Sequence, residues 1–81
     1  MSTLRVLSRR GDDRQVWDAR AYCADDPEAL AAVREAERIF AEERARGSMA
    51  FVVQRGQPPR RVDTFDPQAD QIVLVPRVVG G

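Results

Sequence analysis

The sequence predicts an α+β domain in which one mixed sheet of four or five strands carries a single helix across one face. Two alternating apolar segments flank a polar turn near the N-terminus, an amphipathic segment follows, and the last apolar run is apolar on both faces. One helix covers only one face of a sheet, so a single sheet in the order ββαβ(β)β is the simplest arrangement. The 81 residues suffice for one small domain, which we expect at 1–76, with an extended tail at 77–81.

The first segment, TLRVLSRRGDDRQVWDARAY, contains two extended stretches. Leu4 and Val6 alternate with polar residues, RRGDD supplies turn formers, and an extended stretch resumes at Gln15–Trp17. This pattern predicts a β-hairpin. Two interpretations of Trp17 stay open, because so large an apolar side chain either caps the core or serves as an exposed contact on the sheet.

The predicted helix has clear boundaries. Asp26 is a favourable N-cap, Pro27 suits the first helical position, and Gly47 suits the residue after the last turn. Between these boundaries an apolar stripe recurs at helical spacing, formed by Ala29, Val33, Ala36 and Phe40. We expect the stripe to face the sheet, and we expect an ion pair between Glu42 and Arg46 on the opposite side.

Three strands are predicted after the helix. SMAFVVQ has high β-propensity, and we assign Met49, Phe51 and Val53 to its inward face. RRVDTF is a plausible short strand, and QIVLVP is the most apolar one, which predicts a central position. If the first and last strands pair in parallel, the hairpin adjoins the central strand and the helix forms part of a right-handed crossover.

Composition and charge exclude several classes of protein. All 13 basic residues are arginine, they balance 13 acidic residues, and the resulting neutrality argues against a nucleic-acid partner. No apolar run approaches the length of roughly 20 residues that a membrane span needs. We therefore expect a cytoplasmic protein with no membrane partner.

The residue types for catalysis are also scarce. The chain has no His and no Lys, which removes the usual general bases near neutral pH. Cys23 has no His to activate it, and a metal site would consist of carboxylates alone. The sequence predicts a chain that is not itself an enzyme and that binds no metal or cofactor.

The segment ADQIVLVPRVVGG, residues 69–81, resembles the ends of β-grasp sulfur carriers, namely the molybdopterin-synthase small subunit and the thiamine sulfur carrier. It is also similar to ubiquitin-like modifiers, which end in an arginine-bearing tail and the same diglycine. The order of elements extends the likeness to the whole chain. The resemblance implies a β-grasp fold and a Gly81 carboxylate that a separate adenylating enzyme activates with ATP.

Each tail residue has a physical part in such chemistry. Gly80 and Gly81 add no side chains in a narrow enzyme channel and adopt unusual backbone angles. Val78 and Val79 stiffen an extended approach, and the Arg77 guanidinium can bind acidic groups of an activating enzyme. Pro76 ends the sheet ladder before them, because proline has no amide hydrogen to donate.

Two departures from the sulfur carriers distinguish the branches of this superfamily. Arg77 follows Pro76 where the carriers commonly have a second proline, and the predicted helix is longer than theirs. Both departures favour a prokaryotic (bacterial) ubiquitin-like protein modifier, joined to target proteins through Gly81 by isopeptide bonds. Its further partners would be a conjugating enzyme and an isopeptidase.

Two alternatives to the modifier stay open. One is a sulfur carrier that bears a Gly81 thiocarboxylate, and the other is a non-covalent β-grasp interaction module. Whether processing exposes the diglycine also stays open. For a modifier, the lack of Lys leaves only the N-terminal amine, or a Ser, Thr or Cys side chain, as an acceptor on the chain itself.

In this superfamily, partners bind the exposed face of the sheet. Four apolar residues lie out of phase with the inward positions assigned above and are candidates for such a surface: Leu7, Trp17, Val52 and Val73. For each of them the alternative is a place in the core.

Overall fold

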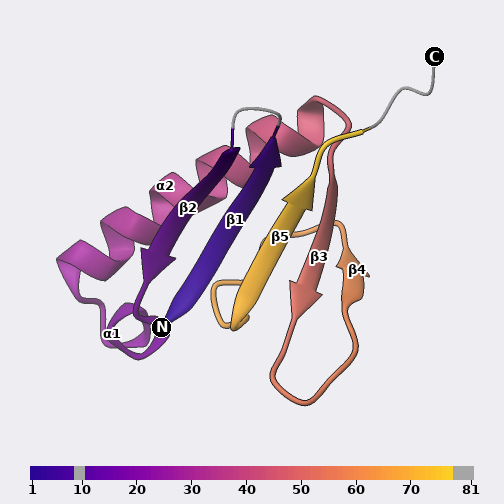
Figure 1. Cartoon of the computed structure of the whole chain (residues 1–81). Helices are drawn as coiled ribbons and strands as arrows, with labels where there is room; N and C mark the ends of the chain where they lie inside the picture. The colour runs from indigo at the N-terminus through magenta and orange to yellow at the C-terminus, as the bar shows by residue number, and fades with distance from the viewer. Residues whose placement is uncertain (9–10, 78–81) are drawn as a thin grey trace.

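Among the described residues, five strands form one open mixed sheet in the order β2-β1-β5-β3-β4 (Figure 1). The structure is a computed structural model that describes residues 1–8 and 11–77. The strands are β1 (Ser2–Ser8), β2 (Gly11–Trp17), β3 (Met49–Val53), β4 (Arg60–Val62) and β5 (Gln71–Val75), and the helices are α1 (Ala19–Cys23) and α2 (Pro27–Ala45). The predicted α+β class and the single mixed sheet are confirmed.

Strand β5 lies at the centre of the sheet, as its apolar sequence predicts. It pairs in parallel with β1, where Ile72 lies beside Leu4, and antiparallel with β3, where Ile72 lies beside Val52. Strand β1 also pairs antiparallel with β2 in a hairpin. The predicted hairpin and the parallel pairing of the first and last strands are both confirmed.

Helix α2 lies across one face of the sheet and leaves the other face uncovered (Figure 1). Its N-terminus is capped by Asp26, whose carboxylate accepts a hydrogen bond from the backbone N–H of Ala29 at 3.1 Å. The four residues of the predicted stripe are its four buried residues: Ala29, Val33, Ala36 and Phe40. The helix and its orientation therefore follow from the sequence pattern.

The inward face of β3 is the reverse of the one that we assigned from the sequence. Ala50 and Val52 are buried on the helix side, whereas Met49 is 37% exposed and Phe51 is half-buried. The register explains the reversal, because Ala50 and Val52 lie beside the buried Leu74 and Ile72 of β5. Residues paired across neighbouring strands lie on the same face of a sheet.

A short helix, α1, which we did not predict from the sequence, follows β2. Asp18 caps it, and its carboxylate accepts hydrogen bonds from the backbone N–H groups of Arg20 and Ala21 at 2.9 and 3.3 Å. The sequence signal that could have predicted this helix is an aspartate, a favourable N-cap residue, directly before Ala-Arg-Ala.

The segment between β4 and β5 contributes one aromatic ring, that of Phe65, which packs against the core. Phe65 packs against Trp17 and Phe40, with ring centroids 5.6 and 5.8 Å apart. The Trp17 Nε1–H also donates a hydrogen bond to the Pro67 carbonyl. This loop thereby ties the edge strand β2 to the helix side of the sheet.

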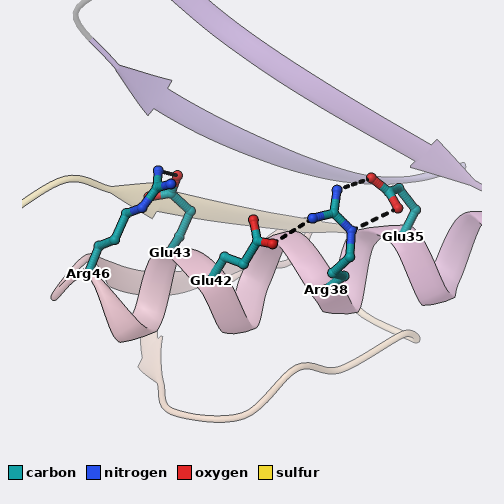
Figure 2. Close-up of polar contacts among 5 residues, drawn as sticks. All are labelled: Glu35, Arg38, Glu42, Glu43 and Arg46. Carbon is teal, nitrogen blue, oxygen red and sulfur yellow. Dashed lines mark hydrogen bonds and ion pairs between the residues drawn. The ribbon is translucent and has the colours of Figure 1, made fainter.

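The solvent-facing side of α2 carries arginine–glutamate pairs (Figure 2). Arg38 lies between Glu35 and Glu42, and its Nη1 is 2.6 Å from Glu42 Oε1. Arg46 pairs with Glu43, at 3.5 Å, so the expected pair of Glu42 with Arg46 is wrong. Glu42 instead pairs with Arg38, which lies one turn earlier in the helix.

Candidate functional site

The candidate site is the point where the tail leaves the sheet. Strand β5 ends at Val75, which pairs with Met49, and Pro76 follows directly. Figure 1 shows the chain leaving beside the turn that joins α2 to β3. Of the predicted tail residues, only Arg77 lies within the described part of the chain. Outside it lie the other four, Val78, Val79, Gly80 and Gly81.

The aliphatic part of Arg77 packs over Gly47. A Cβ atom placed on Gly47 would lie 3.4 Å from Arg77 Cδ and 3.8 Å from its Cβ, which is van der Waals contact. Arg77 is nevertheless exposed as a residue. The helix-end turn therefore contacts the stem of Arg77, while the residue remains accessible to solvent.

The turn beneath Arg77 is a Schellman motif. The Ser48 N–H donates to the Glu43 carbonyl and the Gly47 N–H to the Arg44 carbonyl, both at 3.0 Å. Gly47 has a φ of +95°, a conformation that side-chain-bearing residues rarely adopt. The motif satisfies carbonyl groups at the end of α2 and fixes the path from the helix into β3.

Polar side chains reinforce the same turn. Arg44 donates from Nη1 to the Ser48 carbonyl at 2.7 Å and from Nη2 to Asp63 Oδ1 at 3.0 Å. Ser48, which is buried, donates from Oγ to Glu43 Oε2 at 3.1 Å. Arg44 thereby connects α2, the turn and the segment after β4.

The four predicted partner-surface residues separate into two pairs. Trp17 is 2% exposed and Val52 is 1% exposed, so both belong to the core and the prediction of a contact surface is wrong for them. Leu7 and Val73 are half-buried and lie on the face that α2 leaves open. Phe51, which pairs with Val73, lies on that face as well and was missed through the reversed phase of β3.

Chemically reactive groups are few in the described residues. Cys23 is exposed, and the Gln68 side-chain amide donates a hydrogen bond to its Sγ at 3.0 Å. Across 1–8 and 11–77, no three Cys, Asp or Glu residues are grouped so that they could hold a metal ion. In the same residues, neither helix combines the length and the apolar character of a membrane span.

Comparison with profiles of protein families, with curated proteins and with solved structures gave no match to this chain.

Proposed function

We propose that this chain is a β-grasp protein that serves as a prokaryotic ubiquitin-like modifier. The Gly81 carboxylate, once it is the chain terminus, is adenylated by a separate enzyme and joined to target proteins. One observation carries the proposal: the central strand leads directly into Pro76 and Arg77 at a braced helix-end turn, and Val-Val-Gly-Gly follows in the sequence. Because activation uses ATP, the proposal places the protein in the cytoplasm.

The arrangement of the sheet supports the finer fold assignment. The order β2-β1-β5-β3-β4, with β1 and β5 parallel and α2 across one face, is the arrangement that a β-grasp requires. The helix lies between the second and third strands in sequence, and so forms part of the connection from the hairpin to the other half of the sheet.

The proposed chemistry uses only the terminal carboxylate of the chain. A Gly81 carboxylate oxygen attacks the α-phosphorus of ATP, and pyrophosphate leaves. A nucleophile on the next protein then attacks the acyl carbon, and AMP leaves. The residues of this chain position the carboxylate: Pro76 ends the ladder, Arg77 offers its guanidinium to the enzyme, and the two glycines fit a narrow channel.

The open face of the sheet is the proposed surface for partner proteins. Leu7, Phe51 and Val73 lie there on three neighbouring strands, and Phe51 is paired with Val73. In the same row Arg5 lies beside Val73 and Arg61 lies beside Phe51, so this apolar pair is flanked by arginines. Partly exposed apolar residues that adjoin one another are typical of protein-binding surfaces.

The proposal is tested on N-terminally tagged protein expressed in its native host and purified under denaturing conditions. Arg77 is the last arginine of a chain without lysine, so trypsin would leave Val78–Gly81 as a remnant on each acceptor residue. Mass spectrometry is expected to find this remnant on lysines of other proteins. A matched variant that lacks Gly80 and Gly81 is expected to give none.

Two other results would replace the proposal. An intact mass in which sulfur replaces one oxygen, with no remnant on other proteins, would identify a sulfur carrier. Unmodified protein, together with a diglycine-deletion strain that behaves as the parent, would leave only the non-covalent interaction module.

A further inference from the structure

We draw no further inference here: the strongest candidate, the apolar pair of Phe51 and Val73 on the open face of the sheet, belongs to the partner surface already proposed, and nothing in the described residues shows what covers it.

Discussion

The indole Nε1 of Trp17 donates a hydrogen bond to the Pro67 carbonyl oxygen, 2.9 Å away and 50 residues later in the chain. This bond joins the edge strand β2 to the loop that leads into the central strand. Trp17 is buried, and its ring contacts Phe65, so the polar and apolar parts of the indole act on the same loop.

Replacing Trp17 by Phe removes the hydrogen bond and part of the ring volume. We expect the free energy of unfolding to fall by about 1–3 kcal/mol, because the Pro67 carbonyl loses its partner and a cavity remains. Urea denaturation measures this change. Phe65→Leu is a matched variant that keeps this hydrogen bond and alters the ring contact. If Phe65→Leu alone lowered the free energy of unfolding, the Nε1–H hydrogen bond would contribute nothing to stability.

Replacing Gly47 by Ala tests whether the backbone conformation of Gly47 or the space around it limits the residue type in the turn beneath Arg77. The new methyl group would make ordinary contact with Arg77, whereas the φ of +95° is strained for any L-residue. We expect a loss of about 1 kcal/mol in the free energy of unfolding.

The same substitution in an Arg77→Ala background should cost as much, since the strain lies in the backbone. A double-mutant cycle by urea denaturation measures the difference. Gly47→Asn should cost less than Gly47→Ala, because Asn tolerates this conformation better. A cost that disappears without Arg77 would instead point to steric contact.

The pKa of Glu35 lies below its ordinary value of 4.5, chiefly because the Arg38 guanidinium donates hydrogen bonds to the carboxylate. The same pairing raises the pKa of Arg38. A carboxyl group whose pKa is lowered by folding stabilises the folded state at pH values above its ordinary pKa. This contribution is lost as the pH falls through the lowered pKa.

Arg38→Ala is therefore expected to raise the pKa of Glu35 toward 4.5. A titration followed by carbon NMR of the Glu35 carboxyl group measures the shift. Arg34→Ala, on the same exposed side of α2, serves as the control and should leave this pKa unchanged. Because the pair is exposed, about 0.5 M salt should reduce the difference between the parent and Arg38→Ala.

Helix α2 shows what the sequence could predict about the fold. The N-cap Asp26, Pro27 and the positive-φ Gly47 act through local chemistry, and the buried stripe follows from a regular spacing. The central position of β5 was predicted for a similar reason, because a strand that is apolar on both faces is unfavourable at an exposed edge.

Strand β3 shows what the sequence could not predict. Size suggested that Met49, Phe51 and Val53 face the core, but the closely packed helix side accepts the small Ala50 instead. The phase of a strand that is apolar on both faces depends on its register with β5, which is a long-range relationship. For the same reason Val52 was predicted as a surface candidate although it is buried, and Phe51 was not predicted to lie on the open face.

The candidate site was predictable only in part. The tail residues were found from the sequence because glycine, proline and arginine each act through local properties. The packing of Arg77 over Gly47 joins two residues 30 positions apart and has no local signal.

The parallel pairing of β1 with β5 has a mechanical consequence. Tension between the start of β1 and the end of β5 pulls the two strands in opposite directions along their length, so the ladder between them is loaded in shear. All its hydrogen bonds must then yield nearly together rather than one after another. Force applied through the tail would therefore act first on the central strand. The force that the domain withstands would be set by the rate at which the domain unfolds.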